Sequence, residues 1–119
     1  MMNESRYPWF ILVPRRADMR EMHHLSTADQ KQLWQESAQL SQLLEEQFQP
    51  DKLNVAAIGN MVPQLHIHHI ARYKTDAAWP APVWGKFTPL AYKTGESSER
   101  LQLIRRSLQL QLNPSDLPR

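Results

Sequence analysis

Apolar residues recur along this chain with two different periods, and the longer period predicts one long helix. Between residues 27 and 48 they return at helical spacing, with Trp34 at the edge of the apolar stripe. The stripe consists of Leu33, Leu40, Leu43, Leu44 and Phe48. Thr27 followed by Gln30 is typical of a capping box in the first turn, and Pro50 ends the helix because proline lacks a backbone N–H. We expect this helix to bury its leucines in the core.

The shorter period, with continuous or alternating apolar residues, predicts three strands. Residues 9–13 form an apolar run between two prolines, and residues 53–58 form a second run. Residues 65–73 begin with alternating apolar and polar side chains. The loop between the last two segments is short, and its Gly59 and Asn60 both tolerate a positive φ. We therefore expect these two strands to form an antiparallel hairpin.

The C-terminal third predicts an anchored loop and a final helix. Residues 79–85 are rich in tryptophan and proline, so we expect an extended loop whose aromatic rings pack on the core or on a partner subunit, in preference to covering the histidines. A helix is predicted over residues 96–112. Its apolar stripe consists of Leu101, Ile104, Leu108 and Leu112. Leu103 and Leu110 add a second stripe, which is compatible with a subunit interface, and residues 113–119 are expected to fray.

Composition narrows the class of protein. With 119 residues, of which 41% are hydrophobic and 22% charged, residues 1–119 are expected to form one packed domain. The net charge of +2 does not indicate sequence-specific binding to nucleic acid. The lack of cysteine excludes disulfides, zinc–thiolate sites and thiol catalysis. No apolar run is long enough to span a membrane and no signal-peptide pattern opens the chain, so we expect a cytoplasmic protein with no membrane partner.

The predicted third strand carries the most concentrated chemistry of the chain. Three of the five histidines fall within the four residues 66–69. Because successive side chains of a strand point to opposite faces, Gln64, His66 and His68 are expected to share one face. Ile67 and His69 then lie on the other face, where His69 is expected to be partly buried with a hydrogen-bond partner.

Neutral imidazoles in a row suit phosphoryl transfer. One histidine nitrogen attacks phosphorus, a second group stabilises or protonates the leaving oxygen, and neutral donors hold the nonbridging oxygens. His66 and His68 have the types and spacing for the first two tasks, and Gln64, Asn54 and Asn60 have the type for the third. These five residues are the site that the pattern suggests.

Two other interpretations of the histidines stay open at this point. His66 and His68 can chelate a metal such as zinc or iron, although this requires a third protein ligand and no acidic residue lies between positions 51 and 76. They can also be polar side chains on an exposed sheet face. The adjacent pair His23–His24 is expected to be surface polar, because neighbouring side chains do not face the same way.

Residues 64–72 resemble the signature His-φ-His-φ-His-φ-φ of the histidine triad (HIT) superfamily, in which φ is apolar. The segment Phe-Ile-Leu-Val-Pro-Arg at 10–15 is similar to the early strand of that family, and the long helix and residues 53–55 follow in the same order. The resemblance covers residues 7–73. The Trp-Pro-Ala-Pro-Val-Trp loop at 79–84 is similar to a loop in a group of bacterial HIT proteins. Within the superfamily, the chain resembles the diadenosine tetraphosphate hydrolase-like group.

The resemblance implies a fold, a reaction and residue roles. The fold is α+β: a HIT-like antiparallel sheet with a long helix packed across it and a C-terminal helix, commonly in a homodimer. The activity is that of a nucleotide phosphohydrolase or nucleotidyl transferase acting at the α-phosphate, on dinucleoside polyphosphates or nucleoside phosphoramidates, with no metal or other cofactor. His66 corresponds to the nucleophile that forms a nucleotidyl–histidine intermediate, and His68 to the histidine at the leaving group. Asn54 and Asn60 loosely match phosphate-contacting positions.

The chain departs from the family pattern at several places. Gln64 replaces the first histidine, but the family uses the backbone carbonyl there to accept a hydrogen bond from the nucleophile. His69 occupies an apolar position, Ala71 replaces the usual proline, and the loop before the strand lacks most of the family's glycines. Only six residues precede Tyr7, so we expect either a longer start than Met1 or an incomplete base and ribose pocket. A nucleotide-binding protein with little turnover is therefore an alternative function.

Overall fold

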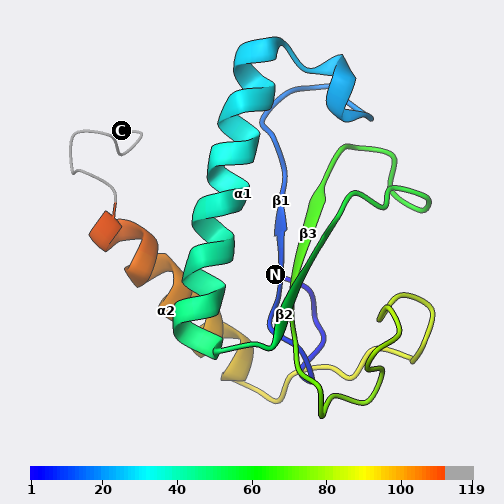
Figure 1. The fold of residues 1–119 in the computed structure, drawn as a ribbon, viewed down its shortest axis with the longest axis vertical. Coiled ribbons are helices and arrows are strands. Elements are labelled where there is room, and N and C mark those ends of the chain that lie inside the picture. Colours follow the sequence, from blue (N-terminus) through cyan, green and yellow to red (C-terminus); the bar gives the residue numbers. More distant parts are fainter. Residues whose placement is uncertain (112–119) are drawn as a thin grey trace.

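The structure, a computed structural model, describes residues 1–111, with the backbone alone for residues 109–111. Its elements are β1 (Trp9–Leu12), the 3-10 helix η1 (Met22–His24), α1 (Thr27–Phe48), β2 (Lys52–Ala56), β3 (Ile67–Arg72) and α2 (Glu96–Gln111) (Figure 1). The strands form an antiparallel sheet in the order β1-β3-β2. The predicted α+β fold and the antiparallel pairing of the last two strands are thus confirmed. The predicted helical residue Leu112 and the tail 113–119 lie outside the described residues.

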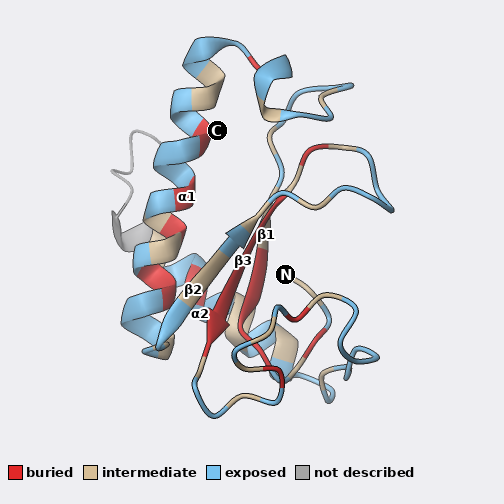
Figure 2. Ribbon diagram, turned by 45° about the vertical axis from the view of Figure 1, so that its right-hand side comes forward, coloured by how far each residue is buried: buried red, intermediate tan, exposed pale blue. Residues whose placement is uncertain are grey.

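The two faces of the sheet carry different parts of the core. Residues paired across an antiparallel sheet share a face, so Phe10, paired with His69, lies on the face that α1 covers. Leu43 and Leu44 of α1 are fully buried against that side. Trp9, paired with Ile70, lies on the opposite face, where the loop after β3 covers it. Figure 2 shows that β3 is buried throughout, whereas β2 at the sheet edge is partly exposed.

The long helix has the predicted length but a different cap. Ser26, not Thr27, is the N-cap, and its hydroxyl accepts the backbone N–H of Asp29 at 3.1 Å. The side chain of Gln30 donates to the Leu25 carbonyl instead of closing a capping box with Thr27. Helical periodicity locates the body of a helix, whereas the cap depends on which neighbouring hydroxyl reaches the first free N–H.

Each strand is shorter than its apolar run predicts. Val13, expected in the first strand, is 55% exposed and lies beyond it. β2 ends at Ala56, two residues early, because the chain then leaves the sheet. β3 begins at Ile67, since the Leu65 N–H donates to the Met19 carbonyl at 2.8 Å and not to a neighbouring strand. Leu65 thereby ties the connection after β1 to the entrance of the histidine strand.

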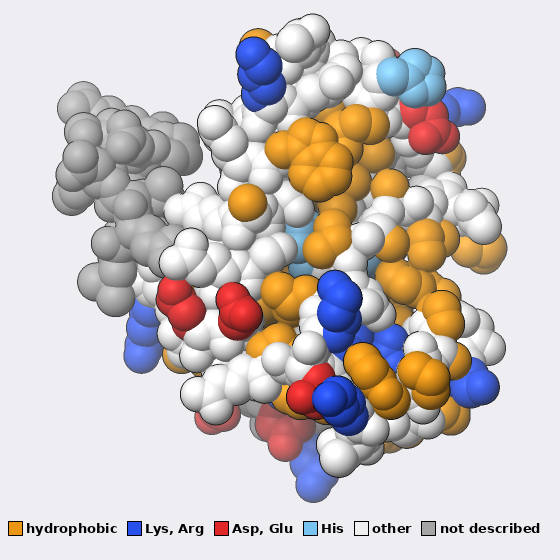
Figure 3. Space-filling model, viewed as in Figure 1, with side chains coloured by type: hydrophobic (Ala, Val, Ile, Leu, Met, Phe, Trp, Pro, Cys, Tyr) orange, Lys and Arg blue, Asp and Glu red, His pale blue; other side chains and the backbone are white. Residues whose placement is uncertain are grey.

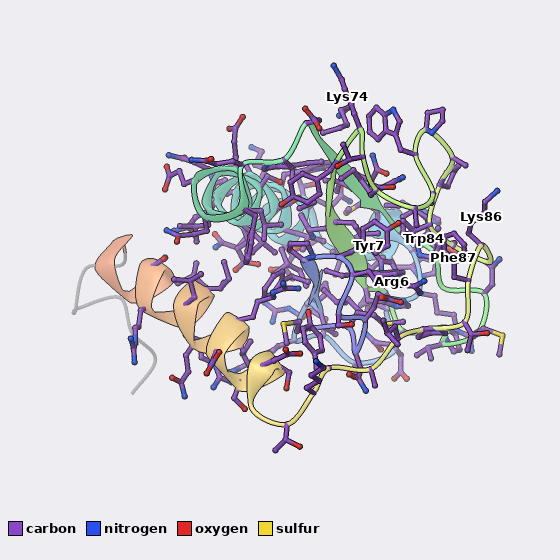
Figure 4. All side chains as sticks on the ribbon, turned by 90° about the horizontal axis from the view of Figure 1, so that it is seen from below. Arg6, Tyr7, Lys74, Trp84, Lys86 and Phe87 are labelled. Atoms are coloured by element: carbon purple, nitrogen blue, oxygen red, sulfur yellow. The ribbon has the colours of Figure 1, made fainter. Side chains whose placement is uncertain are left out.

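A buried ion pair shapes the loop that follows β3. Arg72, 1% exposed, binds both carboxylate oxygens of Asp76 at 2.8 and 3.1 Å and also donates to the Ala81 carbonyl. Burial alone raises the pKa of Asp76, but hydrogen bonds from Arg72 and from the Tyr73 backbone outweigh it and lower the pKa to about 2. The loop is therefore ordered by a charged clamp, and it carries Trp84 back towards the sheet. Figure 4 shows Trp84 beside Tyr7, which belongs to the same apolar cluster.

The final helix packs on the end of α1. Ile104 is buried in the same cluster as Leu40 and Leu43, whereas Leu103 is 40% exposed. Figure 3 shows apolar side chains gathered in the middle of one face of the molecule. The other member of the predicted second stripe, Leu110, lies where no side chain is described. The homodimer that this stripe suggested therefore stays a prediction. Among residues 1–111, no helix combines the length and the apolar character that crossing a membrane requires.

Candidate active site

His66 is oriented by the residue that replaces the first histidine of the motif. Its Nδ1 lies 2.7 Å from the backbone carbonyl of Gln64. A carbonyl oxygen only accepts, so Nδ1 carries the proton of the neutral ring and Nε2 keeps a free electron pair. The side chain is half-buried. The nitrogen that remains accessible for attack is therefore Nε2, and it is fixed by a backbone group rather than by a side chain.

His68 is held in the opposite tautomer. The indole Nε1–H of Trp9 donates to its Nδ1 at 2.9 Å. Indole nitrogen is a donor only, so Nδ1 must accept and the proton of neutral His68 sits on Nε2. Burial, reinforced by the charge of His66, lowers the pKa of His68 despite an opposing interaction with the Ile58 backbone. At neutral pH the ring is therefore uncharged.

The two imidazoles form one centre, backed by two tryptophans. The ring centroids of His66 and His68 are 4.9 Å apart. Trp84 meets His68 edge-on at 5.5 Å and Trp9 at 5.8 Å. Trp84 therefore packs on the core, as predicted, and it also contacts His68, which the prediction considered less favoured. Together these rings exclude water from the inner side of His68.

His69 points away from this centre, as its position in the strand predicts. It is fully buried, and its Nδ1–H donates to the Ile67 carbonyl at 3.1 Å. Its Nε2 then accepts the hydroxyl of Ser37 on α1 at 2.7 Å. Burial lowers the pKa of His69, so it stays neutral. This histidine is structural, and it is fully rather than partly buried.

A cavity of about 200 Å³ opens beside His66. It is lined by Arg20, Glu21, Ala57, Gly59, Asn60, Pro63, Leu65 and His66. Gly59 tolerates a positive φ but does not adopt one here. A Cβ at Gly59 would stand 3.1 Å from the Val62 carbonyl oxygen, closer than such contacts usually are, so the loop packs tightly against this glycine. A larger groove of about 660 Å³ lies between the ends of the two helices, but no histidine lines it.

Arg20 is a residue of this cavity that the sequence did not indicate. It lies in the polar connection before η1, and within residues 1–111 its guanidinium has no hydrogen-bond or ion-pair partner. The hydrogen bond between Leu65 and Met19 brings this connection beside His66. A contact between segments so far apart in the chain leaves no periodic pattern in the sequence, so it could not be predicted. His23 and His24, in contrast, are exposed as expected (Figure 3 shows a histidine at the surface near η1).

The three amides predicted to bind phosphate have different surroundings. Asn60 lines the cavity with His66. The Gln64 side chain donates to the Arg16 carbonyl at 3.1 Å. The Asn54 side-chain oxygen accepts from Arg72 at 2.8 Å, which leaves its amide nitrogen as the free donor. The structure thus places Asn60 in the same cavity as His66, and it links Asn54 to the clamp of the following loop.

A metal site would need ligands that the histidine pair does not have nearby. Among residues 1–111, no three side chains of the types His, Asp and Glu come close enough together to hold a metal ion. His66 and His68 are two nitrogen donors, and a structural zinc site needs four ligands. A third His, Asp or Glu ligand would have to come from outside the described residues.

Comparison with known proteins identifies the family. A model of the HIT domain matches residues 1–75. No curated protein sequence matches the chain. Among solved structures, the chain is similar to a histidine triad protein from Bradyrhizobium japonicum, with 48% identity, a TM-score of 0.85, and coverage of 88% of this chain and 78% of that one.

Two further solved structures show the same likeness. A histidine triad protein from Marinobacter aquaeolei is 48% identical with a TM-score of 0.85, over 91% of this chain and 81% of that one. A histidine triad protein from Sinorhizobium meliloti is 39% identical with a TM-score of 0.86, over 89% of this chain and 78% of that one. The family match and these structures show that the chain belongs to the histidine triad (HIT) family.

Proposed function

We propose that this protein is a nucleotide phosphohydrolase or nucleotidyl transferase that acts at the α-phosphate through a covalent intermediate on His66. Members of the HIT family are typically nucleotide hydrolases or transferases. The observation that supports this reaction best is the 2.7 Å contact between His66 Nδ1 and the Gln64 carbonyl. It leaves Nε2 as a neutral nucleophile and stabilises the positive charge that the ring gains on attack.

The proposed reaction has two displacements. His66 Nε2 attacks the α-phosphorus, the bond to the leaving group breaks, and its electron pair leaves with that group. A water molecule then attacks the same phosphorus, the P–N bond breaks, and its electron pair returns to Nε2 while the extra proton of water goes to solvent. In the transferase alternative another nucleophile replaces water. His68 contacts the leaving group, and Asn60, Asn54 and Gln64 are the proposed amide contacts of the substrate.

The test of this function is a panel of nucleotides assayed for binding and turnover. We expect a dinucleoside polyphosphate or a nucleoside phosphoramidate to raise the melting temperature and to release a nucleoside monophosphate without added metal. Binding without turnover would favour the alternative of a nucleotide-binding protein. If no nucleotide shifts the melting temperature or is consumed, both functions fail, and metal analysis of protein purified without a histidine tag tests the remaining alternative.

We further propose that Arg20 contacts the phosphates of the substrate. A guanidinium forms charge-assisted hydrogen bonds with phosphate oxygens, and at an exposed site such a contact is worth about 1 kcal/mol. Arg20→Ala is therefore expected to raise KM roughly fivefold with little change in kcat. Arg15→Ala is the matched control, because Arg15 is exposed and does not line this cavity. Equal effects of the two substitutions would exclude a specific contact by Arg20.

A further inference from the structure

The hydrogen bond from Trp9 restricts what His68 can do during the reaction. To act as a general acid, a histidine must give up a proton and remain a stable neutral ring, which requires that it carry two protons beforehand. In this structure Nδ1 of His68 faces the N–H of Trp9, so a second proton on Nδ1 would oppose another donor at 2.9 Å. If neutral His68 instead released its Nε2 proton, it would become an imidazolate anion.

Apart from the Ile58 backbone, which raises the pKa of His68, the surroundings of this ring supply no group that favours a second proton. Ile11 of β1 and Ala56 of β2 pair with it on the same face, and both are apolar. Trp84 covers it from the loop after β3. The titratable group whose charge acts on it is His66, and that charge opposes protonation. His68 itself is 6% exposed, so protonation would also place a charge in a buried position.

We propose that Trp9 is a positioning residue that holds His68 as a neutral Nε2–H donor, and that the enzyme therefore prefers substrates whose leaving group departs as a stable anion. The inference rests on the proposed function. His68 donates a hydrogen bond to the departing oxygen but transfers no proton to it. In the step, the bond from the α-phosphorus to the leaving oxygen breaks, the electron pair stays on that oxygen, and the new bond is from His66 Nε2 to phosphorus.

This property separates the two proposed classes of substrate. A phosphoanhydride, such as a dinucleoside polyphosphate, releases a phosphate whose oxygen is stable as an anion near neutral pH. A phosphoramidate releases an amine, whose nitrogen must receive a proton before or during departure. General acid catalysis contributes about 10²–10⁴-fold where it operates. Without a proton from His68, we expect the phosphoanhydride to exceed the phosphoramidate by about 100-fold in kcat/KM.

The tautomer is tested by nitrogen NMR of the histidine rings. In the native protein we expect His68 Nδ1 to show the resonance of an unprotonated nitrogen and Nε2 that of a protonated one. Trp9→Phe keeps an aromatic ring and removes the donor, so the midpoint of the His68 titration should rise. Trp84→Phe is the matched control: Trp84 also contacts the His68 ring, but its buried Nε1 has no hydrogen-bond partner within the described residues. It should leave the tautomer of His68 unchanged.

The leaving-group preference is tested by kinetics on diadenosine tetraphosphate and adenosine 5′-phosphoramidate between pH 6 and pH 8. We expect Trp9→Phe to lower the ratio of the two kcat/KM values several-fold at pH 6, where His68 can then carry two protons, and Trp84→Phe to leave the ratio unchanged. Equal turnover of both substrates by the native enzyme overturns the proposal. So does a protonated Nδ1 on His68, or the same change of ratio in both tryptophan variants.

These measurements also separate the inference from the function on which it rests. If neither substrate is consumed, the proposed function fails and the leaving-group preference falls with it, while the NMR spectrum still decides the tautomer. If nucleotides are consumed but the tautomer is wrong, the function stands and the inference fails. Should Trp9→Phe not fold, the native spectrum and the native ratio of kcat/KM values still decide the question.

Discussion

His66→Ala is expected to reduce nucleotide turnover by about a thousandfold or more while the protein remains folded. Removal of a covalent nucleophile has effects of this size or larger, because the remaining groups can stabilise only an uncatalysed attack by water. After acid or denaturant quenching, the mass of the intact native protein should include a fraction heavier by one nucleotidyl group. His66→Ala should show no such adduct. Steady-state kinetics and circular dichroism complete the measurement.

Two control variants make this result specific. His23→Ala removes an exposed histidine of η1 and should leave turnover unchanged. Gln64→Ala should retain turnover within a few-fold, because the group that orients His66 is the backbone carbonyl of residue 64 and not its side chain. An adduct that persists in His66→Ala, or a loss in Gln64→Ala as large as in His66→Ala, would refute the proposed role of His66.

Asp76→Asn is expected to destabilise the protein by about 3–5 kcal/mol. The substitution leaves the Arg72 guanidinium charged and buried without its counter-ion, and removing one partner of a buried pair has a cost of this order. The side chains of the pair are only 2% and 7% exposed. Because Asp76 also accepts the backbone N–H groups of Ala78 and Trp79, we expect the loop that carries Trp84 to loosen as well. The free energy of unfolding in urea measures the effect.

The chain offers a matched control for this substitution at the surface. Arg16 and Asp29 form a second bidentate pair with distances of 2.7 and 3.0 Å, but their side chains are 54% and 28% exposed. Asp29→Asn is expected to cost about 0–1 kcal/mol, since water screens an exposed pair and solvates the charge that remains. If the two substitutions had equal costs, burial of the Arg72–Asp76 pair would not be the source of its strength.

The same pair predicts a dependence of stability on acid. The pKa of Asp76 falls from its ordinary 3.8 to about 2 in the folded protein. The unfolded chain therefore binds the proton more readily, so the contribution of Asp76 is complete above about pH 4 and is lost as the pH falls towards 2. Its size is about 2 kcal/mol. Asp76→Asn should remove this part of the acid dependence. It should leave the part that comes from Glu4, because hydrogen bonds from Arg6 lower the pKa of Glu4 to about 2 as well.

Local sequence patterns were sufficient wherever one face of an element had to be buried. The stripe from Leu33 to Phe48 located the body of α1, since helical spacing leaves one set of positions to bury. The alternation in the histidine strand correctly predicted that His69 lies on the face opposite His68. Strand ends were less predictable, as Val13 shows, because the last residue of a strand is decided by hydrogen bonds to another segment.

The family motif supplied the roles proposed for His66 and His68 and implied the contact between His66 and the carbonyl of residue 64, but no pattern near His68 indicated where its proton is placed. That depends on Trp9, which is 59 positions away from its acceptor in the sequence. Arg20 likewise reaches the cavity through a hydrogen bond between segments far apart in the chain. Side-chain partners at such separations leave no periodic signal, because they require only that two residues meet after folding.

The sequence by itself thus determined the helices and the antiparallel hairpin, because burial imposes a period on neighbouring residues. Its histidine motif also showed the likeness to the HIT family. The tertiary structure decided which atoms of the site donate and which accept. His66 is directed by a backbone carbonyl and His68 by an indole N–H, and these two opposite partners leave Nε2 of His66 with a free electron pair and Nε2 of His68 with a proton. The physical reason is that a histidine's tautomer depends on its hydrogen-bond partners, and the fold chooses them.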